Sequence, residues 1–209
     1  MPKRGYHHGN LRQALVDAAL DLITVKGPTG FTLSQAAKAA GVTPAAVYRH
    51  FAGRDDLIAE AARQGYTIMD QVMRQAQTQI QTQAKPGALE RFQVTCRTYL
   101  EFARQYPGHY IAMFESGVPV SRTEGLNTAA TQARSVLDQA VHDLVQLLPP
   151  GACPPDTMFA NHIWALSHGV VELFARNSTG IPAPYSPEEM LERGVNVYLR
   201  GLGVRLDND

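Results

Sequence analysis

Residues 32–57 read TLSQAAKAAGVTPAAVYRHFAGRDDL, and this stretch decides the fold. Small apolar residues recur at helical spacing up to Ala40, and Gly41 follows at the place where a left-handed residue ends a helix. Thr43 and Pro44 then form the N-cap and first-position pair that begins another helix. We therefore predict a helix, a three-residue turn and a second helix, which is the helix-turn-helix arrangement.

The predicted second helix, residues 43–52, has two unlike sides. Val47 and Phe51 lie four positions apart and are expected to face inward. The outward side then carries Pro44, Ala45, Ala46, Tyr48, Arg49 and His50. Side chains as small as alanine let a helix sit deep in the major groove of DNA, which is wide enough for one α-helix.

Arg49 is the expected reader of bases, because one guanidinium bridges both major-groove acceptors of guanine. Ala45 and Ala46 are placed to touch thymine methyl groups. Plainer interpretations stay open: Tyr48 as a core aromatic, which would turn Val47 and Phe51 outward, and Arg49 and His50 as solvated surface residues.

Positive charge is concentrated at the N-terminal end. Residues 1–54 hold seven Lys and Arg but only Asp17 and Asp21, a net charge of +5, although the whole chain is neutral. A basic end suits a nucleic-acid contact confined to it. Lys3 and Arg4, ahead of the first helix, are placed to reach the DNA backbone or minor groove as an arm, or are simply solvated.

The rest of the chain also predicts helices and no strands. A first helix runs from Asn10 to Gly27, and a long helix runs from Gly53 to about residue 83. Further helices are expected at 88–105, 107–115, 128–148, 158–177 and 186–204, with a loop at 116–127. The fold class is all-α. We place an N-terminal three-helix head in residues 1–55, which include the start of the linking helix, and a C-terminal helical bundle in residues 56–209.

Composition excludes several classes of protein. A hydrophobic content of 44% argues against disorder, and no apolar run approaches the roughly 20 residues that span a bilayer. The polar start lacks the apolar stretch of a signal peptide, so a cytoplasmic protein without a membrane partner is expected. Cys96 and Cys153 form neither a disulfide framework nor a zinc pattern, and His7-His8 has no second ligand pair nearby. We expect no metal and no cofactor.

These residues together resemble the DNA-binding domain of the TetR (tetracycline-repressor-like) family. The resemblance rests on the motif TLSxxA…GVTxxxVYRHFxxRxxL, within roughly residues 10–60. A second, shorter likeness, Trp164 with His168-Gly169, is to the WHG-type ligand-binding domain of a subset of that family. The resemblance assigns mainly phosphate contacts to Tyr48 and His50, and further phosphate contacts to Thr32, Ser34, Thr43 and Arg54.

The resemblance also implies what the C-terminal bundle does. Family members bind a double-stranded operator as homodimers, here expected to form through helices 158–177 and 186–204. A largely apolar small-molecule effector is expected to shift the population of conformations and release the repressor from DNA. Its candidate pocket residues are Tyr99, Tyr106, Tyr110, Met113, Phe114, Trp164 and His168.

Other functions were weighed against this one. An activator or a ligand-independent regulator of the same fold fits the same residues. An all-α enzyme would have to use Cys96, His109, His162 or His168. The sequence has no nucleophile elbow, no His-Glu-x-x-His motif and no phosphate-binding glycine loop, so we expect no enzymatic activity. A purely structural helical protein would leave Tyr48-Arg49-His50 and the basic end unexplained.

Overall fold

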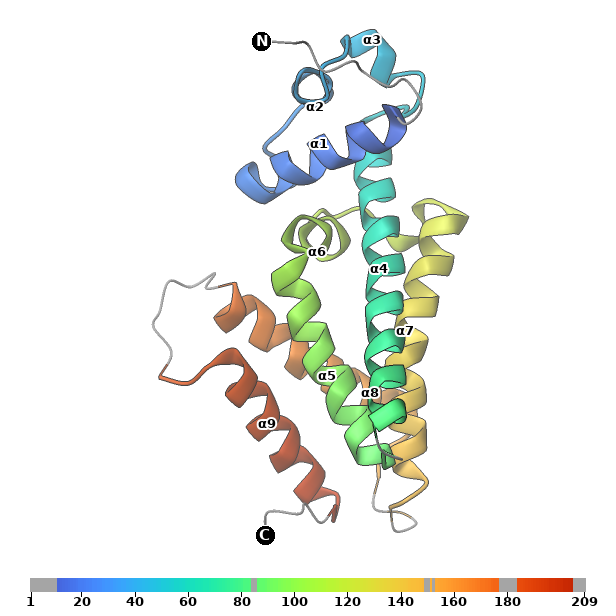
Figure 1. Cartoon of the computed structure of the whole chain (residues 1–209), viewed down its shortest axis with the longest axis vertical. Coiled ribbons are helices and arrows are strands. Elements are labelled where there is room, and N and C mark those ends of the chain that lie inside the picture. Colours follow the sequence, from blue (N-terminus) through green and yellow to red (C-terminus); the bar gives the residue numbers. More distant parts are fainter. Residues whose placement is uncertain (1–10, 84–85, 149–150, 152, 177–183, 205–209) are drawn as a thin grey trace. The chain divides into compact units, whose positions relative to one another are not determined.

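The computed structural model describes residues 11–83, 86–148, 151, 153–176 and 184–204 (Figure 1). Its elements in chain order are α1 (Leu11–Lys26), α2 (Leu33–Ala39), α3 (Pro44–Val47), α4 (Arg54–Gln83), α5 (Ala88–Gln105), α6 (Pro107–Phe114), the 3-10 turn η2 (Val120–Arg122), α7 (Glu124–Val145), α8 (Asp156–Val170), the π-helical turn η3 (Val171–Ala175) and α9 (Pro187–Gly201). These ranges contain no strand, and the predicted all-α fold is confirmed. Lys3, Arg4 and the expected cap Asn10 lie outside the described residues.

The chain divides into two compact units. The first combines residues 1–66 with 106–130, and the second combines 67–105 with 131–209. The boundary predicted after residue 55 does not coincide with this division, because α4 continues without a break past that point and the α6 region packs with the head. As a division of function, the sequence-based boundary stays a prediction.

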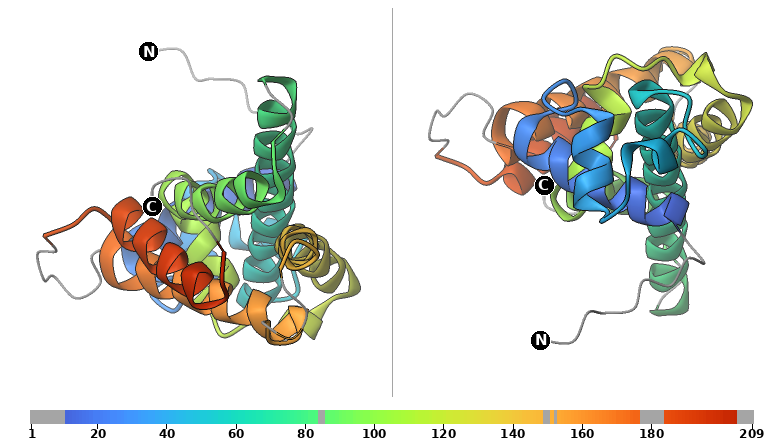
Figure 2. Two further views of the ribbon diagram at one scale, coloured as in Figure 1. Left: turned by 90° about the horizontal axis from the view of Figure 1, so that it is seen from below. Right: turned by 90° about the horizontal axis from the view of Figure 1, so that it is seen from above.

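In the first unit, α1 packs against both α2 and α6, and α2 packs against α3 (Figures 1 and 2). Leu15, Val16 and Ile23 of α1 are completely buried, as their spacing along one helical face requires. Gly108 lets α6 approach α1 closely, because a Cβ atom at this position would lie 2.9 Å from the carbonyl oxygen of Leu20.

In the second unit, α8 and α9 lie side by side and both contact α5 (Figure 2). The predicted start of α9 is confirmed: Ser186 and Glu189 form a capping box, and Pro187 occupies the first helical turn. Leu191 and Val195 recur at a spacing of four on α9 and are buried. This helix therefore presents a narrow apolar stripe to its neighbours.

Two sequence predictions about loops and helix ends were wrong in detail. Residues 116–127 were expected to form a loop, but η2 forms within them and α7 begins at Glu124. Thr123 explains the earlier start, because its hydroxyl accepts a hydrogen bond from the amide of Leu126 and so caps the helix. The expected helix 158–177 begins two residues earlier and ends in the π-helical turn η3. No helix in the described ranges has the length and apolarity needed to cross a membrane.

Candidate nucleic-acid interface

The turn after α2 has the geometry that its sequence predicts. Gly41 has a φ of +73°, in the left-handed region that glycine adopts without strain. Its amide donates to the carbonyl of Lys38, and the amide of Val42 donates to the carbonyl of Ala37. This pair of bonds is a Schellman motif, which satisfies carbonyl groups at the end of the helix. Val42, which follows Gly41, is half-buried.

The start of α2 is fixed by a capping box. The hydroxyl of Thr32 accepts from the amide of Gln35 at 3.2 Å, and the Gln35 side chain accepts from the Thr32 amide at 3.0 Å. Thr43 occupies the N-cap position of α3 but makes no side-chain cap bond. Its exposed hydroxyl is therefore not used in holding the helix end.

The second helix of the motif is shorter than predicted. Residues 43–52 were expected to be helical, but α3 spans Pro44–Val47 and the chain then turns through residues 48–50. One further α-type bond, from the amide of Phe51 to the carbonyl of Val47 at 3.0 Å, continues the helical direction. The turn at residues 48–50 leaves residues 51–53 as the connection to the start of α4 at Arg54.

Burial separates the two sides of this segment. Val47 is 0% and Phe51 is 3% exposed, whereas Tyr48 is 62% exposed. Five of the six predicted outward residues are exposed and one, Ala46, is half-buried; the exposed residues are Pro44, Ala45, Tyr48, Arg49 and His50. Tyr48 is therefore not a core residue, and the side that carries Arg49 faces away from the protein.

The remaining predicted DNA contacts lie on or beside α2 and α4. Thr32 and Ser34 are exposed at the start of α2. Arg54 is half-buried at the start of α4, with its guanidinium 3.6 Å from the carboxylate of Asp55. The sequence analysis missed Lys38, which is exposed on α2 one helical turn after Ser34. The spacing of four between a hydroxyl and a basic residue was the available signal.

A partly buried polar cluster lies behind the outward surface. The Arg12 guanidinium of α1 stacks over the Phe51 ring, 4.9 Å from the ring centroid, and pairs with Glu60 of α4 at 3.1 Å. Glu60 also accepts two hydrogen bonds from Arg63, at 2.7 and 3.0 Å. Its side chain is only 10% exposed. Sequence reasoning missed this cluster, because Arg12 and Glu60 are 48 positions apart and neither belongs to a motif.

The electrostatics of Glu60 follow from these contacts. Burial is the largest single effect and raises the pKa of the carboxyl group, but the hydrogen bonds from Arg63 and Gln64 lower it. The positive charges of Arg63 and Arg12 act in the same direction as the hydrogen bonds, so the pKa lies below its usual value. Glu60 is therefore held ionised, and it links α1 to α4 beneath the turn that carries Arg49.

A second ion pair fixes the start of α4. Arg122 of η2 donates two hydrogen bonds to one carboxylate oxygen of Asp56, at 2.9 and 2.6 Å. Asp55 and Asp56 both lie in the first turn of α4, where the sequence predicted that they would favour the positive end of the helix dipole.

The predicted pocket residues fall into two groups. Tyr99, Trp164 and His168 belong to the second unit, where the Tyr99 hydroxyl and His168 Nδ1 lie 2.9 Å apart. Trp164 and Tyr99 border a small cavity that is also lined by Met73, Thr95, Cys96, Leu137 and Ser167. Burial lowers the pKa of the His168 imidazole, while the charge of Glu172 acts in the opposite direction.

The other four predicted pocket residues belong to the first unit and pack with one another or with its core. They are Tyr106, Tyr110, Met113 and Phe114. The rings of Tyr110 and Phe114 are 4.9 Å apart, and Tyr110 is completely buried.

Burial raises the pKa of the Cys96 thiol to about 12, so this thiol is protonated near neutral pH. The described residues contain no group of three or more His, Cys, Asp and Glu side chains suited to a metal ion.

A helix-turn-helix with an outward basic and aromatic face defines a DNA-binding protein, and the comparisons with known proteins agree. Residues 15–61 match the model for bacterial regulatory proteins of the tetR family. Residues 92–198, more than half of the chain, match the tetracycline-repressor-like C-terminal domain. The chain belongs to this family and is a DNA-binding transcriptional regulator. The description of the C-terminal model names no WHG-type subgroup, so that assignment stays a prediction.

A curated relative is similar in sequence to part of this chain. Over 70 residues the chain is 37% identical to an uncharacterized HTH-type transcriptional regulator of Haemophilus influenzae; the match covers 33% of this chain and 34% of that protein, about a third of its length. Members of the family are generally non-enzymatic, bind DNA operators, and typically dimerise and bind small-molecule effectors.

Solved structures share the fold at low sequence identity. A protein of unknown function from Rhodococcus sp. RHA1 has a TM-score of 0.77 at 23% identity, covering 97% of this chain and 100% of that one. The fatty acid degradation regulator FadR of Bacillus halodurans has a TM-score of 0.68 at 15% identity, covering 98% and 99%. The ketosteroid transcriptional regulator KstR2 of Mycobacterium tuberculosis has a TM-score of 0.64 at 15% identity, covering 95% and 96%.

The cluster around Glu60 predicts a specific dependence of stability on pH. In the unfolded chain the carboxyl has a pKa near 4.5, and in the folded protein its pKa is lower. The contribution of Glu60 to stability is therefore complete above pH 4.5 and is lost as the pH falls through the folded value. Glu60→Gln should cost about 1.5–3 kcal/mol at pH 7, because hydrogen bonds to a charged group are lost.

Urea unfolding of the wild type and Glu60→Gln at a series of pH values measures this effect. The destabilisation of the variant should shrink on acidification below pH 4.5, whereas Glu101→Gln, an exposed change on α5, should match the wild type throughout. If the destabilisation caused by Glu60→Gln stayed constant at acidic pH, the ionised carboxylate would not be what holds α1 and α4 together.

Proposed function

We propose that this regulator binds a two-fold operator as a homodimer, with α3 and the turn after it lying in the major groove. The observation that carries the proposal is the division of this segment into a buried side and an exposed side. Because Val47 and Phe51 are locked inward, Ala45 and Arg49 are the side chains presented to base edges. Arg49 is assigned to guanine, and Ala45 with the half-buried Ala46 is assigned to apolar contact with thymine methyls.

Phosphate contacts are assigned to the groups around this segment. Tyr48, His50 and the uncapped Thr43 hydroxyl lie on the exposed side of α3 and the following turn. The Thr32 hydroxyl accepts a bond within its cap, which leaves its hydrogen for a phosphate oxygen. The set of proposed phosphate contacts also includes Ser34, Arg54 and Lys38. Such contacts set affinity and register, whereas base contacts set sequence preference.

Substitutions at Arg49 and Tyr48 should separate these two roles. Arg49→Ala should cost about 1–3 kcal/mol on the preferred operator and relax the preference at one base position in each half-site. Tyr48→Phe should weaken binding to all sequences alike, because a phosphate contact carries no sequence information. Fluorescence anisotropy with a panel of operator variants at several salt concentrations measures both effects.

Arg97→Ala removes the same charge as Arg49→Ala from an exposed site on α5 and serves as the control. The wild type should lose affinity steeply with salt, because Lys and Arg contacts release counterions from DNA. Unchanged base preference in Arg49→Ala together with unchanged affinity in Tyr48→Phe would refute the proposed recognition segment.

The homodimer is proposed to form through residues 158–177 and 186–204, the range of α8, η3 and α9. Large apolar side chains are exposed along these elements: Met158 is 49%, Leu173 is 45% and Val197 is 68% exposed. Exposed apolar side chains on neighbouring helices are typical of a surface that a second subunit covers. One short recognition segment makes few base contacts, and a dimer doubles their number.

Val197→Arg should therefore convert the dimer to a monomer, because the partner would have to bury an unpaired charge. Val25→Arg is the matched control, since Val25 is 81% exposed on α1 in the other unit. Sedimentation velocity at micromolar concentration distinguishes the two outcomes. A dimer that survives Val197→Arg with unchanged dissociation constant would place the interface elsewhere.

An effector site is proposed in the second unit around Tyr99, Trp164 and His168. The cavity beside Tyr99 and Trp164 has an apolar wall, and the Tyr99–His168 hydrogen bond places a polar group near it. Such a site suits a small, largely apolar molecule held by one oriented polar contact. FadR and KstR2, which share the fold, are named for fatty acid degradation and for a ketosteroid, and both kinds of molecule are largely apolar with one or a few polar groups.

Trp164 is the chain's single tryptophan, so its emission reports on this cavity. In a screen of medium-chain fatty acids and sterols, a compound that shifts Trp164 emission saturably should weaken operator binding over the same concentration range. Ser167→Leu, which fills the cavity, should abolish the response while leaving operator binding intact. A saturating shift with no change in operator affinity would contradict release by ligand, and tighter binding would favour an activator or corepressor mechanism.

A further inference from the structure

An ion pair ties the start of α4 to the segment that precedes α7. Arg122 of η2 donates two hydrogen bonds to one carboxylate oxygen of Asp56, from Nε at 2.9 Å and from Nη2 at 2.6 Å. The two residues are 66 positions apart in the sequence, and their side chains are 35% and 32% exposed. Salt screens such a partly sheltered pair less than a fully exposed one. The contact is therefore suited to fixing one end of α4.

An open hollow in the first unit reaches from this contact to the turn that carries Arg49. Its volume is about 350 Å³. Among its lining residues are His50 and Phe51 of the turn, Asp56 of α4, and Thr123, the residue next to Arg122. Side chains around a space of this size do not fill it, so the turn is not tightly packed on this side. Its position there depends on how firmly the start of α4 is held.

The start of α4 is held on two sides. Leu57 and Ile58 are buried and fix its inner side. Asp56 lies in the same helical turn with a partly exposed side chain, and Arg122 binds it there. Residues 51–53 are the short connection between the turn and α4, so a displacement of the start of α4 also moves the turn.

The same geometry argues against a direct contact between Arg122 and a DNA phosphate. Two of its three guanidinium nitrogens already donate to Asp56. The negative charge of Asp56 also offsets the positive charge of Arg122, so the pair as a whole attracts DNA weakly. An ion pair in this position contributes to DNA binding through the placement of α4 rather than through its charge.

We propose that Arg122 is a positioning residue for DNA binding, which acts through Asp56 and does not touch DNA. It holds the start of α4, and with it the turn that carries Arg49, in the position that the major groove accepts. A turn that is already in place loses less conformational freedom when DNA binds, so the affinity rises without a further contact. This role rests on the recognition segment proposed above.

Two substitutions with opposite effects on charge test this role. Arg122→Met removes a positive charge and Asp56→Ala removes a negative one, so electrostatics alone would weaken DNA binding in the first and strengthen it in the second. A positioning role predicts that both weaken operator binding, by about twofold to fivefold per half-site, the range for a partly exposed ion pair. Fluorescence anisotropy measures the affinity, with the duplex that the wild type selects from a random-sequence library as the probe.

The double variant and the salt dependence identify the route of the effect. Arg122→Met/Asp56→Ala should bind no more weakly than either single variant, because the two residues form one contact. The slope of log affinity against log salt concentration should stay that of the wild type, whereas loss of a direct phosphate contact reduces it by about 1. Arg122→Lys keeps a donor for Asp56 and should recover part of the affinity that Arg122→Met loses. Urea unfolding verifies that each variant is folded under the binding conditions.

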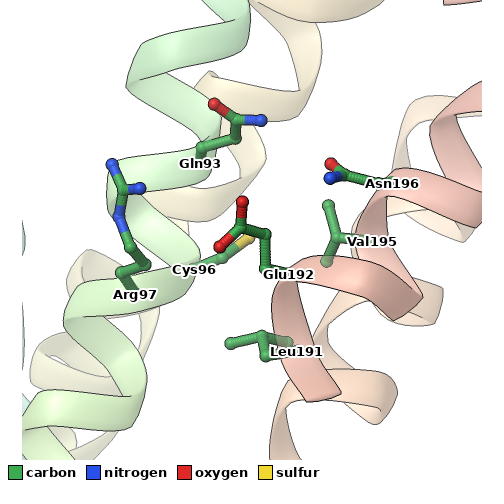
Figure 3. A pocket seen from close by; sticks show the side chains of 7 residues that line it. All are labelled: Gln93, Cys96, Arg97, Leu191, Glu192, Val195 and Asn196. Carbon is green, nitrogen blue, oxygen red and sulfur yellow. The ribbon is translucent and has the colours of Figure 1, made fainter. Parts of the chain in front are cut away.

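Arg97→Met and Asp21→Ala are the matched controls. Arg97 is exposed on α5 (Figure 3), Asp21 is exposed on α1, and neither borders the hollow. Arg97→Met should bind the duplex as the wild type does, and Asp21→Ala should bind it no more weakly.

Four results would overturn the positioning role: unchanged affinity in Arg122→Met, tighter binding in Asp56→Ala, additive losses in the double variant, or a reduced salt slope in Arg122→Met. Arg49→Ala, measured in parallel, separates this role from the proposed recognition segment. If Arg49→Ala relaxes the base preference while Arg122→Met binds as the wild type does, the positioning role alone is wrong. If Arg49→Ala leaves the base preference unchanged, the recognition segment is wrong and the positioning role falls with it.

Discussion

The burial of Val47 and Phe51 is the constraint on which the proposed DNA-binding face depends. Because α3 has only four residues of regular helix, a long helix does not set the direction of the outward side chains. Their direction is set instead by two inward anchors, one at 0% and one at 3% exposure. The α-type hydrogen bond between these two residues keeps them on one side, so Arg49 between them must point away from the protein.

Phe51, one of these two anchors, is held in place by a charged side chain. The Arg12 guanidinium covers one face of the Phe51 ring, and Glu60 holds Arg12 in place. A partly buried carboxylate is stable here because Arg63 and Gln64 satisfy it as well. The same long helix α4 that carries Glu60 continues into the second unit. A rearrangement of that helix would therefore act directly on the support of the proposed recognition turn, as the proposed release of DNA by a ligand requires.

In the second unit, helix α9 carries both a buried side and an exposed side. One side of α9 buries Leu191 and Val195, while Val197 on the same helix is 68% exposed. Proposed dimerisation uses the exposed side, and the proposed effector cavity lies beside α5.

The sequence by itself determined the all-α fold, the helix-turn-helix, its family and the outward set around Arg49, because caps, a turn glycine and apolar spacing act over a few residues. It predicted a longer α3 and a loop where α7 begins, since helix ends depend on where the chain must go next. Tertiary structure alone decided the Arg12–Glu60 contact and the division of the candidate pocket aromatics into two groups. These join residues dozens of positions apart, and no local pattern encodes such distances.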